Sequence, residues 1–149
     1  MKQSRVAAVV FMVLFMAVLL GGCSSRSFTT EKALVDMAKQ YTDLMAAKDY
    51  QKVLPMLTGD QLTAMQNILP TLVGMASNVE LQNENWEGKC DFMNRDKTRG
   101  SVTATYVQHQ TVKNVGTLTQ RFSTVYDFVK IGDQWKIYSI KVMNQETVK

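Results

Sequence analysis

Near residue 78 the hydrophobic pattern of this sequence changes its period, and this change restricts the possible folds more than any other feature. Before that point apolar residues recur at helical spacing, and after it they alternate along four long extended runs. Short polar segments with turn-forming residues separate the runs. Long strands joined by short turns predict an antiparallel meander. The runs are Val79–Met93, Ser101–Val112, Thr117–Val129 and Trp135–Met143.

The first predicted helix starts near Thr30 and carries a continuous apolar face. Thr29 or Thr30 is the expected cap, which places Glu31 in the first turn, where the helix dipole favours a negative charge. Charged residues fall on the other faces, as in a helix that packs on a core. The apolar face consists of Leu34, Met37, Ala38, Tyr41, Leu44 and Met45.

Two further helical segments lie between this helix and the strands. Asp49 is expected to cap a short second helix, which Pro55 perturbs. Pro70 in the third segment removes a backbone hydrogen bond, so a kink or break is expected near Leu69. Three helical segments followed by four strands predict an α+β domain, with the helices packed on one face of a curved, four-stranded antiparallel sheet.

Two stretches resemble the nuclear-transport-factor-two-like superfamily. Residues 33–60, ALVDMAKQYTDLMAAKDYQKVLPMLTGD, are similar to its opening, where a first helix ends in a small-residue and acidic step before a short helix. Residues 122–140, FSTVYDFVKIGDQWKIYSI, are similar to its last hairpin, where a glycine-containing turn precedes Trp-Lys-Ile. The resemblance implies a cone in which helices close a bent sheet around a pocket. The superfamily includes ketosteroid isomerase, dehydratases, epoxide hydrolases and many non-catalytic members, so this fold implies no single function.

The first 23 residues have the pattern of an export signal. Lys2 and Arg5 precede an uninterrupted apolar run from Val6 to Leu20. An uncleaved transmembrane anchor is the alternative, because the run is at the lower limit of spanning length. The tetrapeptide Leu20-Gly21-Gly22-Cys23 that ends the run resembles the lipobox of bacterial lipoproteins. This resemblance implies cleavage before Cys23 and attachment of lipid to its thiol.

The lipobox divides the chain into three parts. Residues 1–22 are the predicted signal peptide, residues 23–30 hold the lipidated Cys23 and a short tether, and residues 31–146 form the α+β domain. Two or more acyl chains attach a protein durably to a membrane. By resemblance to the sorting rule of enteric bacteria, Ser24 favours the outer membrane. We therefore expect a lipid-anchored cell-envelope protein, which faces the periplasm if the host is Gram-negative.

Charge and cysteine content argue against several classes of partner. The chain has a net charge of +4, but removing Lys2 and Arg5 leaves 15 basic residues against 13 acidic ones, a net +2. This excess is too small to predict a nucleic-acid surface. Acylation of Cys23 leaves Cys90 unpaired, as a small buried residue or, alternatively, a reactive or intermolecular thiol. With His109 as the only histidine, no metal site and no cofactor are predicted.

Alternation along the second and third runs predicts which side chains face the helices. Three of these are glutamines, and because buried amides need hydrogen-bond partners, they indicate a polar-lined cavity. Core packing is the simpler interpretation of the aromatic side chains. His109 falls on the opposite face unless a β-bulge reverses the alternation. The predicted pocket residues are Tyr41, Tyr106, Gln108, Gln110, Gln120, Phe122 and Tyr126.

Three classes of function remain open. The leading hypothesis is a non-catalytic, membrane-anchored domain that binds a small molecule or an envelope protein. The second is an acid–base enzyme, which needs an inward carboxylate beside the inward tyrosines. Asp127 alternates outward, so the candidates are Glu80, Glu84 and Asp91, if their strand turns them inward. The third is an assembly component of an envelope or secretion complex.

Overall fold

The computed structural model describes the backbone of residues 26–148 and the side chains from Thr30 onward. The predicted signal peptide, Cys23 and Ser24 lie outside the described residues. Of the described residues, 31–148 form one compact unit. No helix within residues 26–148 is long and apolar enough to cross a membrane. The elements are α2 (Arg26–Ala46), α3 (Tyr50–Val53), the 3-10 helix η1 (Leu54–Met56), α4 (Gly59–Met75), β1 (Val79–Met93), β2 (Arg99–Val112), β3 (Gly116–Ile131) and β4 (Gln134–Thr147).

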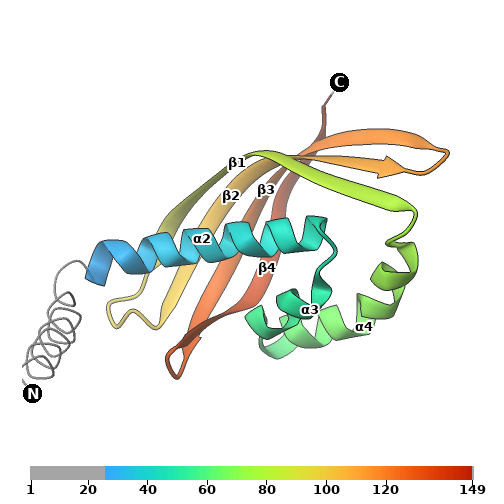
Figure 1. Ribbon diagram of the computed structural model, residues 1–149. Coiled ribbons are helices and arrows are strands. Elements are labelled where there is room, and N and C mark those ends of the chain that lie inside the picture. The colour runs from blue at the N-terminus through green and yellow to red at the C-terminus, as the bar shows by residue number, and fades with distance from the viewer. Residues whose placement is uncertain (1–25, 149) are drawn as a thin grey trace, which may run out of the picture. The chain divides into compact units, whose positions relative to one another are not determined.

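The four strands form one antiparallel sheet in the order β1-β2-β3-β4, which confirms the predicted α+β meander. The sheet is curved and unclosed, and α2 lies across its strands (Figure 1). The last strand continues four residues past Met143, the end predicted from hydrophobicity. Its polar final residues Asn144–Thr147 pair with Gln120–Ser123 of β3. Backbone pairing therefore extends β4 where the side-chain pattern gives no signal.

Two helix features differ from the predictions. The first helix begins at Arg26, so Thr29 and Thr30 lie inside it and do not cap it. The third helix, α4, runs unbroken through Pro70, so of the predicted kink or break the break is not formed. A proline leaves the carbonyl four residues earlier without its helical donor. That carbonyl belongs to exposed Gln66, on a surface where water can replace the lost bond.

The hydrophobic core lies between the helices and one face of the sheet, here called the helix-facing side. Helix α2 approaches β2 closely at Gly100, where an added Cβ would stand 2.5 Å from Cδ1 of buried Leu34. The packing of Leu34 of α2 against β2 depends on the absence of a side chain at Gly100. Burial follows the predicted alternation along β3 and along β2 as far as Ala104, but Val107, which belongs to the opposite set on β2, is buried as well. The core consists of Leu34, Ala38, Tyr41, Val53, Met56, Leu57, Met65, Val102, Ala104, Tyr126, Phe128 and Ile137.

Two β-bulges keep the apolar face of β1 toward the helices. The register shifts between Glu84 and Glu87 and again between Cys90 and Phe92. Each bulge inserts a residue, which allows the same set of side chains to keep facing the core. At the first bulge Trp86 turns its ring over Gly88, where an added Cβ would stand 2.2 Å from the ring. The acidic side chains of β1 consequently stay on the opposite face.

Candidate functional site

Four of the seven predicted pocket residues are aromatic, and the structure arranges them as two pairs. Tyr41 and Tyr126 lie in the core, only 8% and 1% exposed. Their rings meet edge to face with centroids 5.9 Å apart. Tyr106 and Phe122 are half-buried and stack on each other with centroids 5.4 Å apart. The first pair contributes to the core, and the second lies where β2 and β3 emerge from it.

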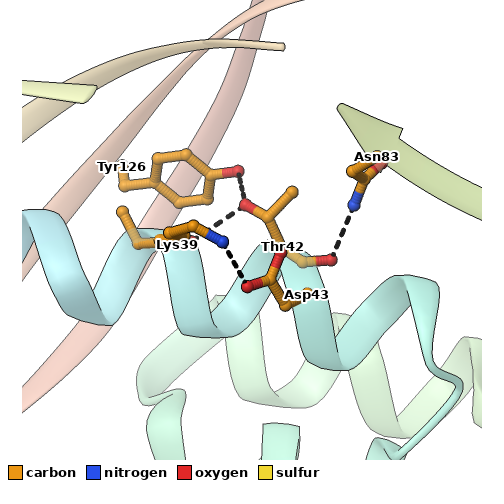
Figure 2. A network of polar contacts seen from close by, with 6 residues as sticks. Lys39, Thr42, Asp43, Asn83 and Tyr126 are labelled. Atoms are coloured by element: carbon orange, nitrogen blue, oxygen red, sulfur yellow. Dashed lines mark hydrogen bonds and ion pairs between the residues drawn. The ribbon is translucent and has the colours of Figure 1, made fainter. Parts of the chain in front are cut away.

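A buried hydroxyl pair links α2 to β3 (Figure 2). The Thr42 hydroxyl lies 2.9 Å from the carbonyl of Ala38 and 2.8 Å from the Tyr126 hydroxyl. A carbonyl only accepts, so Thr42 donates to Ala38 and accepts from Tyr126. Burial raises the pKa of Tyr41 to about 12, with a smaller contribution from the nearby Tyr106. Burial also raises the pKa of Tyr126. Both phenols therefore stay protonated well above neutral pH, and that of Tyr126 donates to Thr42.

The carboxylates considered for acid–base chemistry do not join these tyrosines. Glu80, Glu84 and Asp91 are exposed on the face of β1 that points away from the helices. Asp127 alternates outward on β3, where it forms an ion pair with Lys141 at 3.2 Å. The arrangement that an acid–base mechanism needs, an inward carboxylate beside an inward tyrosine, is not formed by any of these four groups.

One of the three predicted cavity glutamines, Gln108, belongs to a directed chain of amides. Asn83 donates from Nδ2 to the backbone carbonyl of Thr42 at 3.1 Å, and Gln108 donates from Nε2 to Oδ1 of Asn83 at 3.0 Å. Because the Thr42 carbonyl can only accept, it fixes the orientation of both amides. No hydrogen bond among the described residues uses the carbonyl oxygen of Gln108, so this oxygen can accept one. Sequence analysis missed Asn83, although it follows Val79 and Leu81 at the strand period.

Gln108 and Gln110 line a half-open cavity of about 190 Å³ between the sheet and the ends of α2 and α4. Its apolar wall includes Leu72 and Met75 of α4 and Leu81 of β1. The other five predicted pocket residues do not line this cavity. Gln120 lies directly opposite Gln108 in the β2–β3 register, outside the lining. The structure thus brings two of the seven predicted residues together at a cavity.

Lys48 also lines this cavity, and the sequence analysis missed it. It follows the end of α2 with a φ of +61°, and its N–H bonds the carbonyl of Met45 while the N–H of Asp49 bonds that of Leu44. This helix-ending pattern usually carries glycine, because a side chain costs about 1–2 kcal/mol in a left-handed conformation. The Lys48 ammonium donates to the carbonyl of Ala76 at 2.5 Å. It therefore joins the C-terminal ends of α2 and α4.

A second, more open cavity of about 440 Å³ adjoins the first, and Lys48 and Leu81 line both. His109 lines this second cavity from the face opposite the helices, where the alternation placed it. Its Nε2 lies 3.1 Å from a carboxylate oxygen of Glu84, and its Nδ1 lies 2.9 Å from the hydroxyl of Thr119. Both ring nitrogens are thus held by polar partners.

Cys90 is a free, half-buried thiol on the helix-facing side of β1. Its Sγ donates to the carbonyl of Phe92 at 3.4 Å. Burial raises the pKa of the thiol, and the nearby carboxylate of Glu31 raises it further. The thiolate is the reactive form of cysteine, so this environment lowers its reactivity.

Comparisons with known proteins identify the fold but no family. No protein-family model matches the sequence, and no curated protein sequence matches it. Among solved structures, the chain is similar to the crystal structure of the intermembrane space region of the chloroplast protein ARC6. The TM-score is 0.57, and the match covers 75% of this chain and 95% of that chain at 17% identity. At this identity the likeness supports the α+β fold alone.

Proposed function

We propose that this protein is a lipid-anchored component of the cell envelope whose α+β domain binds a small molecule in the cavity beside Gln108 and Gln110. The observation that carries the proposal is that two amides from one strand line a mostly apolar opening between the sheet and the helix ends. Ligand sites are typically concave and apolar with a few fixed polar groups. The similarity of residues 33–60 and 122–140 to the nuclear-transport-factor-two-like superfamily supports the same function, because its cone encloses a pocket.

The anchor is proposed from the sequence. A basic start, an apolar run and Leu20-Gly21-Gly22-Cys23 form the pattern of a lipoprotein signal. Mass spectrometry of the membrane-bound protein should find a chain that begins at Cys23 and carries acyl chains. Replacing Cys23 with serine should leave the leader attached and the protein without lipid. A mature wild-type chain that still contains Met1–Gly22 would contradict the anchor, as would an unmodified Cys23.

The ligand-binding function is tested by what the protein retains. The full chain is purified from membranes of its own host, and the released small molecules are identified by mass spectrometry. Ala76→Leu adds bulk to the cavity wall and should abolish retention, whereas Ala64→Leu, at an exposed position of the same helix, should not. Equal retention by both variants, or no retained molecule in the wild type, would contradict the proposal.

An assembly role is the second candidate, and the outer edge of β4 favours it. Leu57 pairs with Ile137 and covers the edge there. Beyond that point no other described strand pairs with the outer edge, and Val142 and Met143 are 56% and 66% exposed. Exposed apolar strand edges are sites of pairing with other chains. A photo-crosslinker at Met143 should then capture one defined envelope protein in intact cells, and one at exposed Thr71 of α4 should not.

A further inference from the structure

We propose that the cavity between α2, α4 and the sheet takes a small amphipathic carboxylic acid. The carboxylate of this acid pairs with the ammonium of Lys48, and its apolar body lies against Leu72, Met75 and Leu81. This inference rests on the proposed ligand-binding function, because it names the class of molecule that the same cavity accepts.

Charge is the first support. Lys48 is the charged residue among those that line the cavity, so an anionic group is the complementary one. Its ammonium has three N–H donors, and the carbonyl of Ala76 takes one of them. Within the described residues no carboxylate lies at ion-pair distance from Lys48, whereas Lys39 and Lys52 each have one. Two charge-assisted donors therefore remain for an acceptor in the cavity.

The backbone at Lys48 is the second support. A left-handed residue at the end of a helix is most easily glycine or asparagine. This position holds a long cationic side chain instead, and the bond to Ala76 directs that side chain along the cavity wall. The position of the ammonium is thus fixed before a ligand arrives, and this reduces the entropic cost of binding.

The volume of the cavity and the residues of its wall indicate the size and polarity of the ligand. An apolar cavity of about 150 Å³ holds benzene, and this one measures about 190 Å³. It therefore accepts a molecule of about six to eight non-hydrogen atoms, on the same scale. The apolar side chains on the wall favour a hydrocarbon body, and the neutral amides of Gln108 and Gln110 offer hydrogen bonds without a second charge.

Lys48 lies at the boundary between the two cavities, where it can bind the carboxylate of the ligand. Lys48 and Leu81 line both cavities, and the second is the more open one. A carboxylate at this boundary keeps part of its hydration, which limits the desolvation cost of an ion pair. Glu80 lines the open cavity and repels an anion, so it weakens the interaction without reversing it. Replacing Glu80 with glutamine should therefore tighten binding of the acid.

The experiment compares three head groups on one hydrocarbon chain. The full chain is labelled with 13C at its methionine methyl groups, placed in lipid nanodiscs, and titrated with hexanoate, 1-hexanol and hexylamine. Met75 lines the cavity and reports binding, and Met143, exposed on β4, serves as the internal control. Hexanoate should shift the Met75 signal saturably and bind about two- to five-fold tighter than hexanol, the range of a partly exposed ion pair. Hexylamine should bind most weakly.

Variants of Lys48 identify the group that selects the acid. Lys48→Met should abolish the preference for hexanoate over hexanol, and Lys48→Arg should retain it. The ratio of the two affinities is compared between proteins in the same nanodiscs, so that partition into lipid cancels. If Lys48→Met fails to fold, the comparison of hexanoate, 1-hexanol and hexylamine on the wild-type protein still tests the inference. Equal binding of acid and alcohol, or tightest binding of the amine, would overturn this inference and leave the ligand-binding function intact. No saturable shift of Met75 by any of the three would also overturn this inference, and the retention experiment then tests the ligand-binding function separately.

Discussion

The two ends of the central strands β2 and β3 differ sharply in burial. Beneath the helices Val102, Tyr126 and Phe128 are at most 1% exposed. Beyond the stacked Tyr106 and Phe122 the same strands carry glutamines on the helix-facing side, and Leu118 is 43% exposed. The first region is called here the covered half and the second the open half.

The difference shows how one sheet forms both a core and a cavity wall. Helix α2 ends at Ala46, and the tip of the β2–β3 hairpin extends past this end (Figure 1). A strand under a helix must carry apolar side chains, because burying an unpaired polar group is costly. Where the helices stop, amides are tolerated and can be fixed by partners such as Asn83. The open half therefore forms the proposed ligand site, and the covered half contributes most of the stability of the fold.

The largest expected effect is the loss of a large side chain from the covered half. Phe128→Ala should lower the free energy of unfolding by about 3–5 kcal/mol, because it removes buried contacts and leaves a cavity. Leu118→Ala, at a position of the open half that is 43% exposed, should change it by less than about 1 kcal/mol. Denaturant unfolding followed by tryptophan fluorescence measures both. Similar losses would mean that the two regions do not differ in packing.

Alkaline pH should also act on the covered half. The pKa of Tyr41 is about 12 in the folded chain and about 10 when unfolded. Between these values the unfolded state binds fewer protons, so stability should fall as pH rises from 10 to 12, by on the order of 2 kcal/mol. Below pH 10 this tyrosine should cause no change. Tyr41→Phe should reduce the fall in the free energy of unfolding at alkaline pH, and Tyr138→Phe, at an exposed site, should not. Denaturant unfolding curves at pH 9 and pH 11 measure this fall.

A single added methyl group should have opposite effects in two places. Gly100→Ala inserts a methyl group between β2 and Leu34 of α2, and should destabilise the protein by about 1–3 kcal/mol. Gly74→Ala meets nothing within 4 Å and lies inside α4, so it should stabilise by about 0.5–1 kcal/mol. Thermal unfolding of the two variants compares them directly. An unchanged or raised stability of Gly100→Ala would refute the close approach of α2 at Gly100.

The smallest effects are expected within the open half itself. Gln108→Leu breaks the bond to Asn83 and should cost about 1 kcal/mol. Gln110→Leu, which has no side-chain hydrogen bond among the described residues, should stay within about 0.5 kcal/mol of the wild type. The pair is measured by denaturant unfolding. If Gln110→Leu cost as much as Gln108→Leu, the open half would depend on both amides for stability.

The strands were the most predictable part of this protein. The bounds of β1 follow from its alternating pattern, and those of β2 and β3 lie within two residues of prediction. The unbroken α4 was not predicted, because Pro70 was expected to kink or break the helix, whereas exposed Gln66 lies where water can replace the lost hydrogen bond. Of the seven predicted pocket residues, only Gln108 and Gln110 line the cavity.

The sequence by itself determined the class of fold and the order of its elements. Hydrophobic periodicity is a local property, so it identifies helices, strands and the residues of each that face a core. Only the tertiary structure decided where the helices stop over the sheet. That decision separates Tyr126 in the core from Gln110 at the cavity, and it brings Lys48 beside a strand whose residues lie thirty or more positions further along the chain. Contacts over such distances depend on the packing of whole elements, and no short stretch of sequence records them.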